Sequence, residues 1–174
     1  EYKVPRIIFS NKMDKMGADF FMSLKSVGDR LGAKSAPIEL PIGAENEFCG
    51  VVNLVTMKAY KFDGTAEENA EEIEIPADMV EKANEYRTKL IEAVVEFDDA
   101  LMEKYLEGTE LTLEEIKSCI RKGTLAAEFF PVLCSDALGN KGVKLLLDAV
   151  LDYLPSPVDV EAIKGVDLDG NEIE

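Results

Sequence analysis

Four residues near the start of the chain, Asn11-Lys12-Met13-Asp14, carry side chains that could read the edge of a nucleotide base. Amide and carboxylate groups form hydrogen bonds with the polar atoms that such an edge presents. The motif directly follows residues 4–10, whose continuous, β-branched apolar pattern predicts a buried strand. The simpler alternative is a polar turn into a helix, because Asn and Asp are good helix caps. Four residues alone leave both interpretations open.

A second polar loop follows a second apolar run, far along the chain. Residues 129–135 predict another buried strand, and Ser135-Asp136-Ala137-Leu138 stands at its end. Both strands run into a loop and then a helix, which is the pattern of crossover connections in α/β proteins. Ligands of such sheets bind beyond the carboxyl ends of the strands. We therefore expect the two loops to form one pocket.

The segments after these loops have the apolar spacing of helices. Residues 17–31 place apolar side chains three and four positions apart, and Gly32 can end that helix. After a turn at 139–142, residues 143–154 predict a second helix that ends at a proline. The fold class expected for this part is α/β, a partial parallel sheet of two strands with flanking helices.

The two predicted strands are separated by many more residues than a crossover requires, which is about a dozen. We expect residues 34–123 to form an inserted α+β subdomain. The segments 1–33 and 124–156 would then form one α/β unit. Residues 157–174, which are acidic and contain proline and glycine, would be a linker toward a next domain.

The predicted insert contains both kinds of element. Residues 35–62 indicate a broken strand followed by a hairpin, and the alternation at 71–76 indicates an edge strand. Residues 77–106 predict one long helix. A further helix begins at Thr112 with a capping box and is expected to stop at Gly123.

Composition narrows the class of protein. The chain has 174 residues and a formal net charge of −16, which repels nucleic-acid phosphates. We therefore expect no direct nucleic-acid contact and favour a basic protein surface as the partner. No apolar run is long enough for a transmembrane span, and no secretory leader is visible. We expect a cytoplasmic protein that is monomeric and makes no membrane contact.

The chain has no histidine and three widely spaced cysteines, Cys49, Cys119 and Cys134. The absence of histidine excludes histidine-based nucleophilic triads and histidine metal sites. The cysteine spacing fits buried thiols in a reducing compartment rather than a disulfide frame or a zinc site. We expect no catalytic residue and no metal site in this chain, which would act by binding and positioning.

An acidic face runs along the predicted long helix, opposite its apolar stripe. At 100° per residue its carboxylates fall within about 60° of arc. They are Glu81, Glu85, Glu92, Glu96, Asp99 and Glu103. A solvated face is the simpler interpretation. Against it, like charges four residues apart are mildly destabilising, and few cations interrupt the row.

The motif at 11–14, continued by Lys15, Gly17, Ala18, Asp19 and Phe20, resembles the guanine-specificity motif of translational GTPases. The stretches LPIGAENEFCGVVNLVTMKAY at 40–60 and GNKGVKLLLDAVLDYLPSPVDV at 139–160 resemble the elongation factor G family in particular. The resemblance covers essentially the whole chain, and these stretches together are far more specific than the four-residue motif alone. The fold class that it implies is α/β, a partial P-loop-GTPase-type sheet of two strands and flanking helices with an inserted α+β subdomain.

The resemblance implies a role for the residues of both loops. Asp14 would accept hydrogen bonds from N1–H and the 2-amino group of guanine, which adenine lacks. Asn11 would hold the N7 edge and tie neighbouring loops, and the Lys12 stem would lie along the base plane. The backbone N–H of Ala137 would meet guanine O6. The implied guanine-binding set is Asn11, Lys12, Asp14, Ser135, Asp136, Ala137 and Leu138.

One residue of that set departs from the family's pattern, which usually has Ser where this chain has Asp136. The Ala that follows is kept, and its backbone donor needs no particular neighbour. Asp136 could replace the serine hydroxyl as a hydrogen-bond acceptor that supports the loop. It could instead add negative charge near O6.

The phosphate-binding half of a GTPase is missing from this sequence. No GxxxxGK[ST] loop occurs, so nothing here cradles the phosphates or positions Mg²⁺. The resemblance therefore implies a fragment of elongation factor G, the ribosome-associated GTPase that drives translocation. The parent would hydrolyse GTP and use Mg²⁺ through residues absent here. The fragment would contact only the guanine end of GTP or GDP and would be inactive.

The insert of this family, the G′ subdomain, meets the basic C-terminal domain of the ribosomal stalk protein through acidic residues. Their spacing matches Glu92, Glu96, Asp99 and Glu103. The resemblance thus implies the ribosome, and its stalk protein in particular, as partners. An acidic patch of this kind would speed encounter more than it deepens affinity.

Two other interpretations stay open. The first is a fragment of a paralogous translational GTPase of the ribosome-protection or peptide-release type, against which the stretches 40–60 and 139–160 argue. The second is a nucleotide-independent acidic interaction module, which would leave Asn11, Asp14 and Ala137 unexplained.

Overall fold

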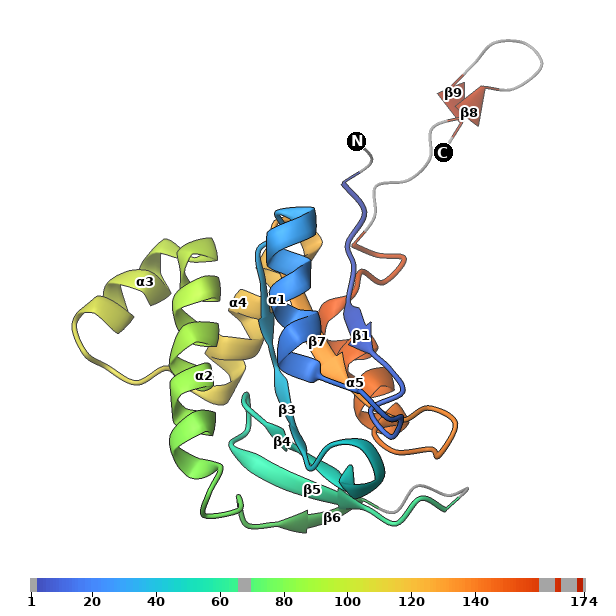
Figure 1. The fold of residues 1–174 in the computed structure, drawn as a ribbon. Coiled ribbons are helices and arrows are strands. Elements are labelled where there is room, and N and C mark those ends of the chain that lie inside the picture. The colour runs from blue at the N-terminus through green and yellow to red at the C-terminus, as the bar shows by residue number, and fades with distance from the viewer. Residues whose placement is uncertain (1–2, 66–69, 160–164, 167–171, 174) are drawn as a thin grey trace.

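The computed structural model describes residues 3–65, 70–159, 165–166 and 172–173, and it combines a parallel with an antiparallel sheet (Figure 1). The parallel sheet has the strand order β1-β7-β2, from β1 (Ile8–Ser10), β7 (Phe130–Cys134) and β2 (Ser35–Pro37). The central strand, β7, is buried at every position. The predicted α/β class is confirmed, but β2 is a third strand where only two were expected.

Helices flank this parallel sheet. α1 (Phe20–Leu31) begins after Asp19, whose carboxylate accepts an N–H of the first turn at 2.8 Å. It ends at Gly32, whose φ of 58° confirms the predicted C-cap. α1 starts later than expected because Gly17, at a φ of 80°, turns the chain before the cap. α5 (Val143–Tyr153) follows the second polar loop, as predicted.

The antiparallel sheet has the order β3-β4-β5-β6. Its strands are β3 (Glu39–Ile42), β4 (Gly50–Asn53), β5 (Lys58–Phe62) and β6 (Ala70–Ile73), with a 3₁₀ turn at Glu45–Glu47 between the first two. The predicted hairpin is the β4–β5 pair, and the predicted edge strand is β6.

One residue joins the two sheets. The N–H of Ile38, between β2 and β3, donates to the carbonyl of Val132 in the parallel sheet at 3.0 Å. The Ile38 carbonyl accepts the N–H of Leu54, directly after β4, at 2.9 Å. The chain therefore changes from one sheet to the other within a single residue, and the antiparallel sheet is anchored to the parallel one by backbone hydrogen bonds.

The prediction of one continuous helix over 77–106 is wrong. The structure has α2 (Val80–Val94), a 3₁₀ turn (Val95–Phe97) and α3 (Asp99–Leu106). Asp98 separates them with an extended backbone, and its side chain caps α3 by accepting an N–H at 3.1 Å. The apolar stripe is nevertheless confirmed, because its members are buried or pack against the core. They are Met79, Ala83, Tyr86, Leu90, Val94, Phe97, Leu101 and Tyr105.

α4 (Leu113–Leu125) begins with the predicted capping box at Thr112. It does not stop at Gly123 as expected, but continues for two further residues. Close packing requires glycine at position 123 instead, because a Cβ there would lie 2.6 Å from the ring of Phe97 and 2.9 Å from Phe129. α4 contacts β7 and α5, so this helix covers the parallel sheet even though it belongs to the predicted insert.

The core is continuous through both sheets. Leu40, Val52, Leu90, Ile116 and Phe129 are fully buried and belong to one apolar cluster. Toward the C-terminus, the two short strands β8 (Gly165–Val166) and β9 (Glu172–Ile173) pair, and most of the predicted linker lies outside the described residues. Among the described helices, none has the length and apolar character of a membrane span.

Candidate functional site

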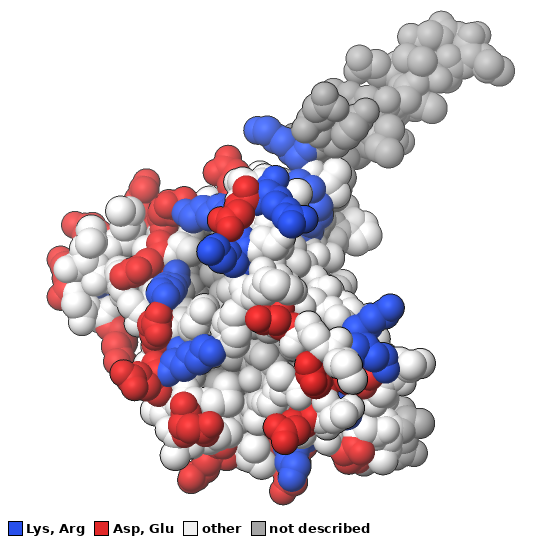
Figure 2. All heavy atoms as spheres, viewed as in Figure 1, with Lys and Arg blue, Asp and Glu red and all other residues white. Residues whose placement is uncertain are grey.

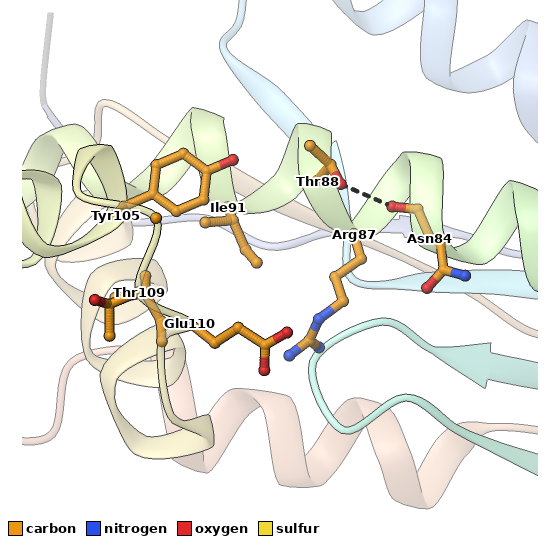
Figure 3. Close-up of a pocket in the computed structure, with 9 residues that line it drawn as sticks. Asn84, Arg87, Thr88, Ile91, Tyr105, Thr109 and Glu110 are labelled. Carbon is orange, nitrogen blue, oxygen red and sulfur yellow. Dashed lines mark hydrogen bonds between the residues drawn. The ribbon is translucent and has the colours of Figure 1, made fainter.

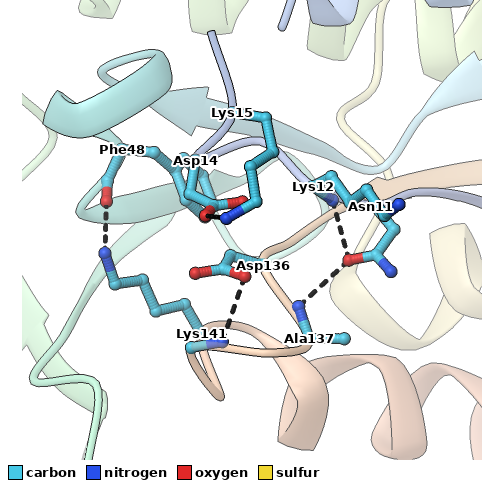
Figure 4. A network of polar contacts seen from close by, with 9 residues as sticks. Asn11, Lys12, Asp14, Lys15, Phe48, Asp136, Ala137 and Lys141 are labelled. Atoms are coloured by element: carbon cyan, nitrogen blue, oxygen red, sulfur yellow. Dashed lines mark hydrogen bonds and ion pairs between the residues drawn. The ribbon is translucent and has the colours of Figure 1, made fainter.

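The two polar loops predicted to form one pocket do meet. The side-chain oxygen of Asn11 accepts the backbone N–H of Ala137 at 3.0 Å, across a sequence separation of 126 residues (Figure 4). The same oxygen accepts the Lys12 N–H at 2.7 Å. A second bond runs from the Met13 N–H to the Ser135 carbonyl at 3.1 Å. The parallel pairing of β1 with β7 brings the loops to the same sheet edge.

Asp14 is the acceptor that this site has available. One of its carboxylate oxygens pairs with Lys15, which lowers the pKa of Asp14 below its ordinary value and keeps the group ionised. The other oxygen, Oδ1, is buried and has no hydrogen-bond partner among the described residues. A buried acceptor without a partner is costly, so it fits a ligand that brings N–H donors to it.

The second loop is closed by Asp136, a residue that is only 5% exposed. Its Oδ1 accepts the Gly139 N–H at 3.0 Å, and its backbone exchanges hydrogen bonds of 3.1 and 2.9 Å with Lys141. A Cβ at Gly139 would lie 2.1 Å from the other carboxylate oxygen of Asp136. Of the two roles considered for Asp136, the structure contains the loop-supporting acceptor.

The remaining members of the predicted set border the loops differently. Asn11, Lys12 and Ala137 are exposed, and Leu138 is 88% exposed. Ser135 is buried, and its hydroxyl has no partner in the part of the chain that the structure describes. Four members of the predicted set therefore lie on the accessible surface of the two loops.

Sequence reasoning missed the residue that fixes the first loop. The Met13 side chain is 3% exposed and lies in the core cluster, between the polar side chains of its neighbours. Lys12 before it has a φ of 65°, a left-handed conformation uncommon outside glycine. An apolar residue inside a polar motif indicates a buried position, and this was the sequence signal that could have identified Met13 as the residue that fixes the loop.

A separate cavity lies away from these loops, between α2 and the segment that joins α3 to α4 (Figure 3). It has a volume of about 340 Å³, and Tyr105, Ile91 and Glu110 line it. Arg87 also lines it and donates to the carbonyls of Leu54 and Val55 at 2.5 and 2.8 Å. Partial burial lowers the pKa of Arg87. Arg87 is thus engaged in holding the β4–β5 turn.

The four predicted stalk-binding residues are all exposed but do not share one helix. Glu92 is on α2, Glu96 is in the 3₁₀ turn, and Asp99 and Glu103 are on α3. Figure 2 shows acidic side chains gathered over the side of the molecule that α2 and α3 form. Glu96 pairs with Lys34 from outside the row. The described residues include no cluster of carboxylates and thiols suited to a metal ion.

Comparison with known proteins decides the family. The model of the family described as the elongation factor Tu GTP-binding domain matches residues 1–156. The chain belongs to this family. This GTP-binding domain chain is 56% identical over all of its 174 residues to elongation factor G of Ureaplasma urealyticum serovar 10, and equally to that of Ureaplasma parvum serovar 3. It spans only 25% of the length of each.

A solved structure from Thermus thermophilus matches with a TM-score of 0.78 and 32% identity. The match covers 89% of this chain and 23% of the Thermus chain. The resemblance to elongation factor G predicted from the sequence is therefore confirmed, as is the predicted fold class, a partial GTPase-type α/β fold with an inserted α+β subdomain.

Proposed function

We propose that this chain supplies the guanine-recognition part of a translational GTPase of the elongation factor G type. The single observation that carries the proposal is the buried Oδ1 of Asp14, an ionised acceptor without a partner among the described residues at the meeting point of two loops. Guanine presents two adjacent donors, N1–H and the 2-amino group, that would satisfy this carboxylate. Adenine has neither donor at those positions, so it would leave the carboxylate unpaired.

The other residues of the loops would orient the base. Asn11 holds the second loop in place, and the Lys12 stem would cover one face of the base. In this structure the Ala137 N–H is bonded to Asn11, so a contact from it to guanine O6 requires that hydrogen to be shared or Asn11 to turn toward N7. Base binding would therefore rearrange the bond that joins the two loops.

A titration of the 174-residue chain with GDP, IDP and ADP, followed by amide NMR, tests this proposal. We expect weak binding, because the sequence has no phosphate loop and the phosphates add nothing here. GDP should shift the amides of Asp14 and Ala137, and IDP, which lacks the 2-amino group, should shift them less. ADP should leave them unchanged. Equal shifts with ADP and GDP would contradict guanine recognition.

The parent activity follows from the same proposal. The relatives are elongation factors G. We therefore assign GTP hydrolysis, Mg²⁺ binding, ribosome binding and translocation to the whole protein, which would act in the cytoplasm. The 174 residues lack the phosphate-binding loop that such chemistry uses. A phosphate-release assay on this chain should therefore give no GTP hydrolysis above background. Measurable turnover would contradict the assignment of hydrolysis to the whole protein rather than to this chain.

A second role is favoured by the exposed carboxylates of Glu92, Glu96, Asp99 and Glu103. We propose that they form the surface that meets the basic C-terminal domain of a ribosomal stalk protein. The break at Asp98 places two of them on each side of it, so the surface is carried by α2, the 3₁₀ turn and α3 rather than by one straight helix. Opposite charge would steer the encounter and make binding sensitive to salt.

The test is a titration of the chain with an isolated stalk C-terminal domain at two salt concentrations. A variant in which all four residues are changed to Lys should lose the shifts on α2 and α3. A control with Glu47, Glu71, Glu74 and Asp78, which are also exposed, changed to Lys alters the net charge equally and should keep them. Equal loss in both variants would reduce the acidic surface to a general charge effect.

A further inference from the structure

The antiparallel sheet and its loops reach both polar loops directly. Glu45, in the 3₁₀ turn after β3, accepts the backbone N–H of Gly17 with its Oε1 at 2.7 Å. From the other loop, the Lys141 ammonium donates to the Phe48 carbonyl at 2.8 Å (Figure 4). Asn140 of that loop donates to the Thr65 carbonyl at 2.8 Å. Two segments of the insert, the β3–β4 connection with Glu45 and Phe48 and the segment after β5 with Thr65, thus hold both sides of the candidate site.

These contacts are specific rather than incidental. Glu45 has a φ of 53°, a left-handed conformation that costs a non-glycine residue energy and persists only where the surroundings hold it. Lys141 is half-buried, and its ammonium lies 5.9 Å from the centre of the Phe48 ring. The Lys141 backbone is at the same time paired with Asp136. A displacement of the Lys141 side chain therefore reaches the loop residue next to Ala137.

We propose that Lys141 and Glu45 are positioning residues for guanine recognition, through which the inserted subdomain fixes the spacing of the two base-reading loops. Neither residue has to touch the base. Lys141 fixes the loop that carries Ala137, and Glu45 fixes the loop that carries Asp14. This inference rests on the proposed guanine-binding function only for its effect on affinity, since the geometric effect on the loops is measurable without any nucleotide.

The first experiment measures amide hydrogen exchange in the chain without nucleotide. The amides of Met13 and Ala137 report the two bonds that join the loops. Lys141→Met keeps the stem and removes the donor, and it should speed exchange at these amides about 3- to 10-fold, as expected for one lost hydrogen bond. Core amides such as that of Ile120 should not change.

Glu45→Ala should speed exchange at Met13 and Gly17 by a similar factor. Two matched controls separate this effect from a loss of charge: Lys61→Met and Glu47→Ala, at exposed positions that hold neither loop. Lys141→Arg, which keeps a donor, should restore most of the protection at Ala137. Unchanged exchange at Met13 and Ala137 in both Lys141→Met and Glu45→Ala would overturn the proposal.

The second experiment compares the affinities of the variants for GDP and IDP. A variant that merely unfolds a fraction of the chain weakens both nucleotides equally. Displaced loops reduce the preference for GDP over IDP, because Asp14 no longer meets the 2-amino group. An unchanged preference in Lys141→Met would also overturn the positioning role. If the unaltered chain binds neither nucleotide, the guanine proposal itself fails, while hydrogen exchange still decides whether the insert positions the loops.

Discussion

The polar loops after β1 and β7 and the acidic surface of α2 and α3 carry the two proposed roles, and they are built differently. The loops are held by tertiary hydrogen bonds from Asn11, Met13 and Lys141, and the acceptor at their centre is buried. The four carboxylates of the acidic surface are exposed, and within the described part of the chain only that of Glu96 forms an ion pair. Base recognition by the loops would therefore depend on the geometry of individual hydrogen bonds. Partner binding by the acidic surface would depend on its total charge.

A substitution should therefore have a different effect in each region. Removing one member of a geometric site leaves a buried group unpaired, which has a large and specific cost. Removing one of several exposed charges changes a sum and is screened by salt. Variants of the loops should therefore show stronger effects than single variants of the acidic surface.

Replacing Asp14 by Asn should exchange the base preference of the chain. The Asn side chain turns one acceptor into a donor, which opposes the 2-amino group of guanine but pairs with the 2-carbonyl of xanthine. GDP binding should fall by about 100-fold or more and become undetectable in an NMR titration, whereas XDP should now shift Ala137. Persisting GDP shifts of unchanged size would place the acceptor elsewhere.

Gly139→Ala should destabilise the chain by about 1–3 kcal/mol, the usual cost of overpacking. The reason is the 2.1 Å approach of the new Cβ to the Asp136 carboxylate. The double variant Asp136→Ala with Gly139→Ala should recover part of the loss in urea unfolding. Gly28→Ala, on α1 with no atom within 4 Å of the new Cβ, is the matched control and should be neutral or mildly stabilising. If Gly139→Ala were as stable as the control, it would contradict the steric conflict between a Cβ at position 139 and the Asp136 carboxylate.

The joint between α2 and α3 should make stability depend on pH. The Lys122 ammonium and the Leu101 N–H hold the pKa of Asp98 below its ordinary value of 3.8. A depressed folded-state pKa stabilises the fold above the unfolded value, and the contribution is lost as the pH falls through the folded pKa. The melting temperature should therefore drop on going from pH 5 to pH 2.5, and less so in Asp98→Asn, which keeps a capping oxygen. An equal drop in both proteins would assign the acid sensitivity to other carboxylates.

Glu103→Gln is expected to have the smallest effect. One exposed charge contributes little to a screened, multi-charge surface, so affinity for the basic stalk domain should change less than about threefold. The variant in which Glu92, Glu96, Asp99 and Glu103 are all changed to Lys should by contrast show no binding at low salt. A tenfold loss of affinity for the stalk domain from Glu103→Gln alone, measured by the same titration, would mean that this carboxylate makes a specific contact rather than adding to a total charge.

Local signals in the sequence were enough for most elements. Thr112 and Gly32 mark a helix start and a helix end through bonds to their own neighbours, so their roles could be predicted without tertiary information. The pairing of the loops at Asn11 and Ala137 was also predictable, because parallel strands place their carboxyl ends together. These features depend on nearby residues or on topology alone.

The missed features depend on distant partners. The helix break at Asp98 interrupts an apolar stripe that continues on both sides, and only the capping residue itself signalled it. Gly123 looked like a helix end, but its small size is needed by the ring of Phe97. The contacts of Lys141 and Glu45 link residues whose sequence separations are 93 and 28, and no local pattern indicates them.

Ile38 sets how the two sheets can move. Its N–H belongs to the hydrogen bonding of the parallel sheet and its carbonyl to that of the antiparallel sheet, so no free linker lies between them. A hinge needs residues whose backbone torsions can change without breaking bonds, and at this point there are none. We therefore expect the antiparallel sheet to move together with β7 as one rigid body.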